Sequence, residues 1–476
     1  MEHWLTKRAL LTPEQTALEL ADGQRLSFRV LRERALSFAE HLARLDIKQQ
    51  VAILSHNSVD MVVALWACTY LQTPVVFLNT KLTNAEWKKQ CEDAHVSTII
   101  TSELLRKQAE SLPVVVVTFA MVKELSALPG TVKETMKEEA ICSMMFTSGT
   151  TGRAKAVQHS YGNHWASAIA SVLNLGLTTD DKWLACLPLF HIGGLSILFK
   201  SVIYGMPVYL LERFDEEQVH QAIMHQRVTM ISVVALTCAR LLERLGDEQY
   251  PETFRCMLLG GGSAPEPLLK KAEQKQVPVI QTYGMTETSS QVVTLHETEA
   301  LRKLGSAGKP LFSASLQIRD GHKALPAKQV GEIAVQGPMI TPGYYQADAS
   351  NQAVFHDGWF YTGDLGFLDE EGFLFVVDRR SDLIISGGEN VYPAEIEAVL
   401  LAFAGVVEAG VTGRTDAKWG KVPVAYVVVS DPAITENALQ AHCEQQLATF
   451  KVPKQIFFRK HLPRNATKKL QRYKLQ

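Results

Sequence analysis

The strongest constraint on the fold is an alternation of short apolar runs and amphipathic segments in the first half of the chain. Residues 51–54, 74–78, 96–100, 114–118 and 228–234 are rich in β-branched and apolar side chains, and they predict strands. Helical patterns lie between them. Strands separated by helices usually pair in parallel, so we expect α/β subdomains arranged in layers around mainly parallel sheets.

Polar side chains mark where several of these helices begin. Ser58 stands before apolar residues at helical spacing, and Asp215 stands before residues 216–225. Thr83 and Glu86 have the spacing of a capping box, in which hydroxyl and carboxylate satisfy each other's free backbone donors. A further helix is predicted at 238–245, where Gly246 follows.

The pattern changes from about Ala307 onward. Short strands with Gly and Pro turns are predicted at 316–319, 331–336 and 373–377, and they indicate a small β-rich subdomain at about 307–380.

After residue 380 the elements alternate again. Helices at 393–401 and 436–448 and strands at 406–412 and 422–429 predict a compact α+β domain over residues 381–476. Residues 1–380 then form the large N-terminal domain, with a boundary near Ser381.

Composition excludes several classes of protein. The 476 residues contain 48 Lys+Arg and 50 Asp+Glu, a net charge of −2, which lacks the basic surplus of a nucleic-acid-binding protein. No uncharged run reaches the roughly 20 residues of a membrane-spanning helix. Seven scattered cysteines without a Cys-x-x-Cys pair argue against zinc and against a disulfide framework. We expect a cytoplasmic protein, and its oligomeric state, including a homo-oligomer, is left open.

The segment Thr147-Ser-Gly-Thr-Thr-Gly-Arg-Ala-Lys155 has the chemistry of a phosphate-binding loop. Its glycines allow backbone N–H groups to approach phosphate oxygens, its hydroxyls donate hydrogen bonds, and its cations offset charge. It matches neither the Walker A pattern nor the dinucleotide-binding fingerprint. From composition alone, a flexible surface turn is an equal alternative.

Four later segments decide between these alternatives. They are Tyr283-Gly-Met-Thr-Glu287, Tyr361-Thr-Gly-Asp364, Asp378-Arg379 with Ser386-Gly-Gly-Glu-Asn390, and Pro463-Arg-Asn-Ala-Thr-Lys-Lys469. In this order, over nearly the whole chain, the set resembles the adenylate-forming superfamily of acyl-CoA synthetases, luciferases and peptide-synthetase adenylation domains. The resemblance implies an adenylation core at 1–380 and a mobile lid domain at 381–476. It also implies ATP, Mg²⁺ and CoA as ligands.

Three stretches, at 187–205, 258–265 and 378–393, resemble more closely the o-succinylbenzoate–CoA ligases of menaquinone biosynthesis. Two departures stand out. The family's usual Gly-Lys-Pro-Lys-Gly is Gly152-Arg-Ala-Lys-Ala156 here, and Lys468 stands where a glycine commonly precedes the catalytic lysine.

The resemblance assigns the nucleotide site. The β- and γ-phosphates would be held by Thr147, Ser148, Gly149, Thr150, Thr151, Gly152 and Lys155. Glu287 would bind Mg²⁺, and Thr286 would donate to the α-phosphate. The adenine would lie between Tyr283-Gly284 and the turn containing Gly261, Gly262 and Ser263, and the ribose would bind Asp364 and Arg379.

The resemblance also assigns the two reaction steps. Lys469, with Lys468 as the alternative, would bridge the substrate carboxylate and the α-phosphate. His191 would gate the acyl pocket and the thiol channel, and Gly387 and Gly388 would let the arm of CoA pass. Because Lys469 and Gly387-Gly388 must serve different steps, a hinge is predicted at Ser381.

The acyl pocket is the least defined part of the site. The aromatic carboxylate of o-succinylbenzoate stays anionic after activation, and a buried anion needs paired donors. The candidate donors to this carboxylate are Ser196, Lys200 and Ser289, with Ser290 and Gln291 next to Ser289 in the sequence.

Three alternatives to this function remain open at this point. The chain could be a CoA ligase for another carboxylic acid, a stand-alone adenylation enzyme that loads a carrier protein, or a nucleotide-binding protein without activity.

Overall fold

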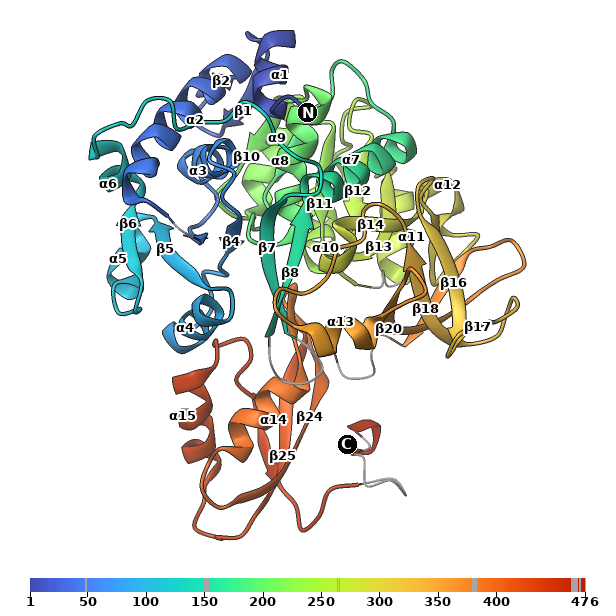
Figure 1. The fold of residues 1–476 in the computed structure, drawn as a ribbon. Helices are drawn as coiled ribbons and strands as arrows, with labels where there is room; N and C mark the ends of the chain where they lie inside the picture. The colour runs from blue at the N-terminus through green and yellow to red at the C-terminus, as the bar shows by residue number, and fades with distance from the viewer. Residues whose placement is uncertain are drawn as a thin grey trace. The chain divides into compact units, whose positions relative to one another are not determined.

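The computed structural model describes residues 1–47, 49–148, 154–262, 264, 266–378, 383–463, 470 and 472–475. The chain divides into two compact units (Figure 1). The first contains residues 1–80, 94–145 and 156–377, and the second contains 81–93, 146–155 and 378–476. Two segments of the predicted core therefore group with the C-terminal residues. The boundary at Ser381 lies outside the described residues and stays a prediction.

The first sheet has the order β6-β5-β3-β4-β7-β8. Its strands are β3 (Gln50–Leu54), β4 (Val75–Phe77), β5 (Val96–Thr101), β6 (Val115–Thr118), β7 (Ile141–Ser148) and β8 (Ala154–Ser160). The pairs β3–β4, β3–β5, β5–β6 and β4–β7 are parallel, as predicted. The intervening helices are α3 (Val59–Tyr70), α4 (Asn84–Asp93), α5 (Glu103–Ala109) and α6 (Phe119–Glu124).

The predicted helix caps are confirmed. The Ser58 hydroxyl accepts from Met61 N at 3.1 Å at the start of α3. Thr83 N donates to Glu86 Oε2 at 2.8 Å and Glu86 N to Thr83 Oγ1 at 3.3 Å, so the capping box forms at α4. Asp215 Oδ1 accepts from Gln218 N at 2.9 Å at the start of α9 (Glu216–His225). These contacts are local in sequence, which is why the pattern of residues predicts them.

One helix start differs from its prediction. The helix expected at 238–245 is α10 (Ala235–Arg244), which begins three residues earlier. The hydroxyl of Thr237 accepts from Val234 N at 3.0 Å and satisfies the backbone donor of the residue before the helix, although Val234 has no polar side chain. The strand before it, β11, covers Met230–Val233.

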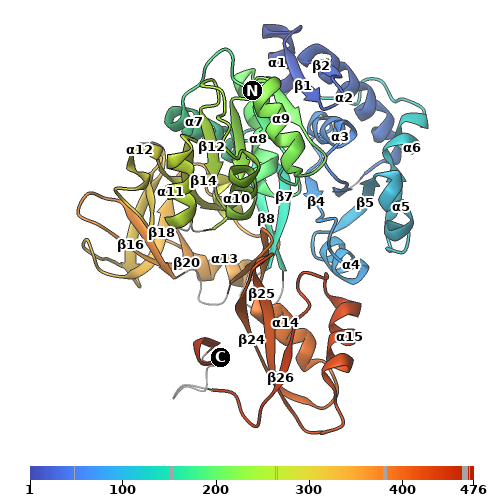
Figure 2. The ribbon, with the colours of Figure 1, turned by 180° about the vertical axis from the view of Figure 1, so that it is seen from behind.

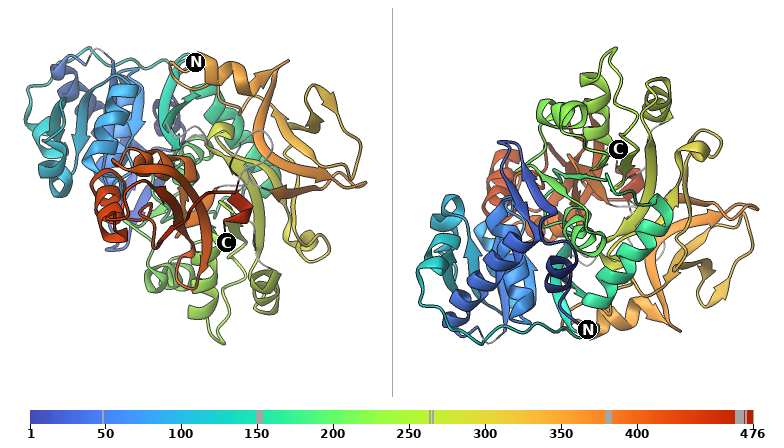
Figure 3. Two further views of the ribbon diagram at one scale, coloured as in Figure 1. Left: turned by 90° about the horizontal axis from the view of Figure 1, so that it is seen from below. Right: turned by 90° about the horizontal axis from the view of Figure 1, so that it is seen from above.

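The second sheet contains a parallel half and an antiparallel half. Its order is β17-β16-β18-β20-β21-β15-β14-β13-β12-β11-β9-β10-β1-β2. The parallel half contains β1 (Thr16–Leu20), β10 (Val208–Leu210), β9 (Trp183–Ala185), β11, β12 (Cys256–Leu259) and β13 (Val279–Met285), and β2 (Arg25–Ser27) ends this side. Pairing of β1 with β10 places the N-terminal strand beside a segment nearly 200 residues away (Figure 3).

Helices lie along this half and connect its strands. They are α1 (Trp4–Leu11), α2 (Phe28–Leu42), α7 (Tyr161–Leu175), α8 (Ile192–Tyr204), α9, α10, α11 (Glu266–Gln274) and α12 (Glu297–Ala300). Apolar residues of α1, α2, α3 and α8 meet in one continuous core.

The predicted β-rich subdomain is present as a continuation of the second sheet. Its elements are β14 (Ser290–Leu295), β15 (Ser306–Pro310), β16 (Ser315–Asp320), β17 (Lys323–Ala324), β18 (Gly331–Gln336), β19 (Phe355–His356), β20 (Trp359–Leu368), β21 (Leu374–Asp378) and the helix α13 (Asp348–Val354). The strands pair in antiparallel fashion around their own apolar core.

The C-terminal sheet has the order β23-β22-β25-β24, with β26 paired to β25. Its elements are β22 (Ile384–Ser386), β23 (Glu389–Val391), α14 (Pro393–Leu401), β24 (Val406–Asp416), β25 (Gly420–Val429), α15 (Glu436–Gln446) and β26 (Ile456–Phe458). Helices α14 and α15 cover one face (Figure 2), and Leu462 and Leu475 pack on Val424 and Tyr426. The predicted α+β unit is confirmed.

A buried lysine connects α4 to this unit. Lys451 Nζ donates to Glu86 Oε1 at 2.6 Å and to Glu395 Oε1 at 2.8 Å. Burial raises the pKa of Glu395, whereas the two carboxylates outweigh burial and raise the pKa of Lys451.

All seven cysteines are buried as free thiols. Within the described ranges, no helix is both long and apolar enough to cross a membrane.

Gly308 and Gly23 give a matched test of how tightly the antiparallel half is packed. Both have positive φ, +106° and +85°, but only at Gly308 would a Cβ atom meet backbone, 2.0 Å from Thr294 O. Gly23→Ala should cost about 1 kcal/mol of unfolding free energy from strain alone. Gly308→Ala should cost at least about 2 kcal/mol more, because the strands must separate. Chemical denaturation followed by circular dichroism measures both, and equal losses would contradict this packing.

Candidate active site

The parallel half of the second sheet brings several predicted site segments to one edge. Strands β12 and β13 pair in parallel, with Leu259 opposite Gln281. The Gly260–Gly262 turn and the segment Tyr283-Gly-Met-Thr-Glu287 therefore leave neighbouring strands at their carboxyl ends. Strand β9 ends at this same edge, and the loop after it leads to His191. The carboxyl edge of parallel strands is where open α/β sheets bind ligands.

The turn after β13 is unusually tight. The single-turn helix η2 (Thr286–Thr288) connects β13 to β14, and Ser289 and Ser290 follow with φ of +53° and +116°. A Cβ at Gly284 would lie 1.9 Å from Ser290 O. Glycine is therefore required at 284 because the backbone of β14 lies directly against it.

Three long-range hydrogen bonds hold the dipeptide Thr286–Glu287. His159 Nε2 lies 2.8 Å from Thr286 O, and Thr341 N donates to Glu287 O at 2.8 Å. The hydroxyl of Tyr344, itself buried, donates to Glu287 Oε1 at 2.9 Å. The carboxylate that the resemblance assigns to Mg²⁺ is thus oriented by a tyrosine that the sequence did not single out.

The donors themselves come from two paired segments. Val157 of β8 forms a bridge with Tyr344, and Tyr345 N donates to Ala156 O at 2.8 Å. The Thr341 hydroxyl donates to Gln158 O at 2.6 Å. Strand β8 and residues 338–345, which we call the clamp segment, therefore form one support beneath Thr286–Glu287.

Tyr283 and Asp364 meet in the structure. The Tyr283 hydroxyl donates to Asp364 Oδ2 at 2.9 Å, and both side chains are buried. Asp364 N in turn donates to the Thr362 hydroxyl at 3.1 Å. The residues assigned to adenine and to ribose are therefore neighbours, although 81 positions separate them.

The predicted phosphate loop connects β7, which ends at Ser148, to β8, which begins at Ala154. Thr147 and Lys155 are both half-buried. Several predicted site residues lie outside the described residues, and their roles stay predictions: Gly149, Thr150, Thr151, Gly152, Ser263, Arg379, Ser381, Lys468 and Lys469.

His191 stands immediately before α8, with its ring edge-on to Phe190 at 4.8 Å between centroids. The loop before it is held by buried Asn57 at the end of β3. Asn57 Nδ2 donates to Leu187 O at 3.0 Å and to Leu211 O at 3.1 Å, and its Oδ1 accepts from Leu189 N at 2.9 Å. This anchor connects the first sheet to the His191 loop.

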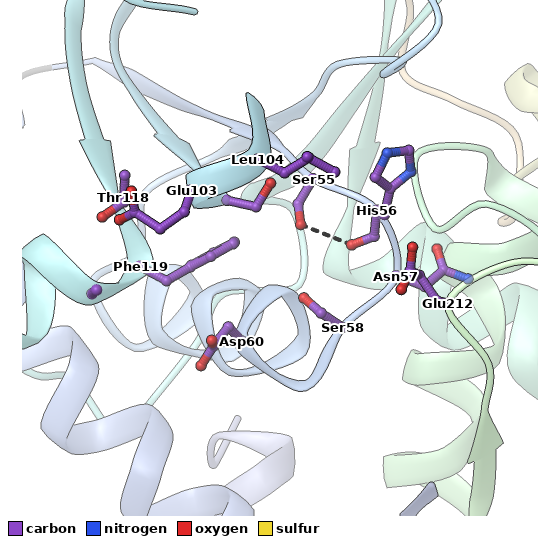
Figure 4. Close-up of a pocket in the computed structure, with 12 residues that line it drawn as sticks. Ser55, His56, Asn57, Ser58, Asp60, Glu103, Leu104, Thr118, Phe119 and Glu212 are labelled. Carbon is purple, nitrogen blue, oxygen red and sulfur yellow. Dashed lines mark hydrogen bonds between the residues drawn. The ribbon is translucent and has the colours of Figure 1, made fainter. Parts of the chain in front are cut away.

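Asn57 also lines a pocket of about 310 Å³ at the carboxyl ends of β3, β5 and β6. Figure 4 shows Phe119 on one side of this pocket and His56 on the other. Glu103, Glu212 and Asp60 contribute carboxylates to its lining. None of the site residues predicted from the sequence lines it.

The predicted substrate residues behave differently from one another. Ser196 and Lys200 lie on α8, both buried. The Lys200 ammonium lies 5.0 Å from the Trp183 ring centroid, and no carboxylate of the described chain pairs with it. Burial lowers the pKa of Lys200 to about 8.

Ser289 is also buried, but its hydroxyl donates to Met339 O at 2.8 Å and so supports the clamp segment.

Gln291 differs from Ser289 in its hydrogen bonding. Its Nε2 and Oε1 are both buried without a hydrogen-bond partner in the part of the chain that the structure describes. Helix α8 packs against β14, the strand that carries Gln291. Buried polar groups without partners are rare, and a water, an ion or a polar ligand can satisfy them.

In the second unit, Gly387 and Gly388 have positive φ, +57° and +86°. Gly387 N donates to Trp419 O at 2.9 Å, and a Cβ at Gly387 would lie 2.7 Å from the Trp419 ring. The glycine is needed for the indole as well as for the predicted passage of CoA. In the sequence, Trp419 is marked only by the glycine that follows it, Gly420, at the start of β25. No local sequence pattern marks His159, Tyr344 or Asn57 as a support of the site.

Comparisons with known proteins show the family of the chain. The AMP-binding enzyme model matches residues 5–345, and the AMP-binding enzyme C-terminal domain matches 395–469. A 2-succinylbenzoate–CoA ligase of Oceanobacillus iheyensis is 50% identical, over 99% of this chain and 98% of that protein. An o-succinylbenzoate CoA synthetase double mutant of Bacillus subtilis, bound with its product analogue, has a TM-score of 0.96 at 47% identity, with 100% and 98% coverage.

The Bacillus subtilis synthetase in complex with ATP and magnesium has a TM-score of 0.77 at 46% identity, with 100% of this chain and 99% of that chain covered. Both domain models match, and the relative and the two solved structures cover 99% or more of this chain. The chain belongs to the AMP-binding enzyme family.

Proposed function

We propose that this protein is an AMP-forming ligase that joins 2-succinylbenzoate (o-succinylbenzoate) to CoA in menaquinone biosynthesis, in the cytoplasm. ATP and Mg²⁺ drive the reaction, and AMP and pyrophosphate leave. The relatives that cover the whole chain carry this activity in their names. The observation that carries the proposal within the structure is a pair of buried polar side chains on packed elements, Lys200 on α8 and Gln291 on β14; the Gln291 amide has no hydrogen-bond partner in the described chain.

In the first step, an oxygen of the substrate's succinyl carboxylate attacks the α-phosphorus and pyrophosphate departs. Both reactants are anions, so the site must supply positive charge and alignment. The loop 147–155 would hold the β- and γ-phosphates, Thr286 would donate to the α-phosphate, and Lys469 would bridge the two reactants.

Glu287 fits a Mg²⁺ site of the kind that nucleotide enzymes use. Within the described ranges, no group of three His, Cys, Asp or Glu side chains could hold a metal alone. Mg²⁺ on ATP takes one or two carboxylates and completes its shell with phosphate oxygens and water. The carboxylate oriented by Tyr344 would hold the cation, which supplies neutralisation of phosphate charge.

In the second step, the CoA sulfur attacks the acyl carbonyl and AMP departs. The thiol needs little help from a base, because thiolate is accessible near neutral pH. His191 would control access to the acyl group, and Gly387 and Gly388 with Trp419 would border the arm of CoA.

The ring carboxylate of the substrate would bind Lys200 and Gln291, with Ser196 one helical turn before Lys200. A carboxylate accepts from both an ammonium and an amide N–H, so it would pair with the Lys200 ammonium and with Gln291 Nε2, whereas Gln291 Oε1 needs a separate donor. Ser289, whose hydroxyl already donates to Met339 O, would act through the clamp segment.

Removal of the ring carboxylate tests the proposed substrate. The value of kcat/KM for 4-oxo-4-phenylbutyrate should be at least about tenfold below that for 2-succinylbenzoate, because a pocket built for an anion leaves its donors unpaired. Lys200→Met should lower kcat/KM for 2-succinylbenzoate and leave that for 4-oxo-4-phenylbutyrate unchanged. The two values should therefore lie closer together in the variant than in the wild-type protein. Near-equal kcat/KM values for the two acids in the wild-type protein would contradict the proposal and favour a general aryl-CoA ligase.

Lys200 also predicts a pH dependence of stability. Its pKa is about 8 in the folded protein, against about 10.4 in an unfolded chain, so between these values the unfolded state binds more protons. Stability should therefore rise with pH from about 8 to about 10.4, and at pH 7 the buried charge costs about 3 kcal/mol. Lys200→Met should raise the unfolding free energy at pH 7 and flatten this slope. If the unfolding free energies of the wild-type protein and of Lys200→Met change with pH in parallel, Lys200 does not cause this pH dependence.

Tyr344→Phe tests the orientation of Glu287. The ring stays while the donor to Glu287 Oε1 is lost, so KM for Mg·ATP should rise about three- to tenfold with little change for CoA. The matched control is Tyr345→Phe, whose hydroxyl lies 3.3 Å from His95 Nδ1 at the surface. If the two variants have the same KM for Mg·ATP, Tyr344 does not orient the carboxylate.

A further inference from the structure

Three buried polar side chains that the mechanism above does not use form a chain of contacts behind the site. Ser143 lies on β7, His159 on β8 and His164 on α7, all buried. Ser143 Oγ lies 2.9 Å from His164 Nε2 and 3.4 Å from His159 Nδ1. The His164 ring stacks on Phe199 at 4.0 Å between centroids, and Phe199 adjoins Lys200 on α8.

The direction of the contact with Thr286 follows from chemistry. A backbone carbonyl only accepts, so His159 Nε2, at 2.8 Å from Thr286 O, carries the proton and donates. Its Nδ1 is then an acceptor, and the Ser143 hydroxyl, 3.4 Å away, is a donor within reach. Burial lowers the pKa of both imidazoles, that of His159 to about 4, so both rings are neutral. A neutral imidazole with this tautomer is a fixed donor of one hydrogen bond.

We infer that His159 is a positioning residue for adenylate formation, which acts by holding the peptide group between Thr286 and Glu287 in one orientation. This inference rests on the proposed function. The same peptide plane connects Thr286, whose hydroxyl would donate to the α-phosphate, to Glu287, whose carboxylate is oriented by Tyr344. With Thr341 N and Tyr344 on the other side, the dipeptide is held from both directions.

The role is confined to one step because the two steps use the dipeptide differently. Glu287 serves the phosphates that leave as pyrophosphate, and that product has departed before CoA attacks. A shift of this peptide plane should therefore slow formation of the adenylate far more than its conversion to the thioester. A histidine that only filled the core would slow both steps alike.

The test compares His159→Leu, which removes the donor, with His159→Gln, whose amide N–H can reach the position of Nε2. Two rates are measured: ATP–pyrophosphate exchange with 2-succinylbenzoate, and thioester formation from the pre-made acyl-adenylate with CoA. His159→Leu should lower exchange by about tenfold or more and thioester formation by less than about threefold. His159→Gln should regain most of the loss in exchange.

A binding measurement adds a readout without turnover. In calorimetric titration of ATP without the acid, Mg²⁺ should strengthen binding to the wild-type protein. That gain should shrink in His159→Leu and return in His159→Gln, since the carboxylate is displaced only in the former. Equal Mg²⁺ dependence in all three proteins would overturn the inference.

His3→Leu is the matched control for loss of a buried imidazole. His3 is also fully buried, lies 2.9 Å from the Thr69 hydroxyl and stacks on Tyr70 at 3.7 Å, and nothing assigns it to the site. It should leave the ratio of the two rates unchanged. If His3→Leu gives the same ratio as His159→Leu, or if His159→Leu slows both steps equally, His159 is structural.

Ser143→Ala keeps the inference testable if His159→Leu does not fold. It frees Nδ1 of His159 and should lower exchange about threefold while sparing thioester formation, and an unchanged exchange rate would overturn the inference. Failure of the proposed function would appear differently, as absence of thioester formation in the wild-type protein.

Discussion

The peptide group between Thr286 and Glu287 is the point on which the rest of the site depends. Its carbonyl and its neighbouring carboxylate accept hydrogen bonds from His159, 127 positions earlier, and Tyr344, 57 positions later. These donors belong to β8 and to the clamp segment, which pair with each other. The site is therefore complete only when the first sheet, the β13–β14 turn and the clamp segment have all folded.

The sequence predicts the elements well because their signals are local. The caps at Ser58 and Asp215 and the capping box at Thr83–Glu86 involve atoms within three residues, so composition and spacing reveal them. The start of α10 was missed because Val234 carries no polar side chain and Thr237 serves in its place. Parallel pairing follows from helices between strands, and the segments of the site fall at the strands' carboxyl ends.

The supports of the site could not be predicted in this way. The Asn57 side chain donates to backbone carbonyls 130 and 154 positions away. No pattern in the sequence around Asn57 predicts those partners. Ser289 was a reasonable substrate candidate, yet its hydroxyl serves Met339 O, a partner that only the tertiary structure reveals. The sequence places Gln291 beside the substrate candidates and does not distinguish it from them. What separates it from Ser289 is the absence of partners for its amide within the described chain, a property of packing and not of sequence.

The burial of all seven cysteines has a meaning for an enzyme whose second substrate is a thiol. Mixed disulfides form when a thiolate attacks a disulfide, so both access and ionisation are required. Burial denies access and raises the pKa of each thiol, to about 12 for Cys68, Cys91 and Cys186. Under oxidising stress, when CoA is converted to its disulfide, this protein offers no sulfur for capture. The only sulfur that exchanges in its chemistry is the one its substrate brings.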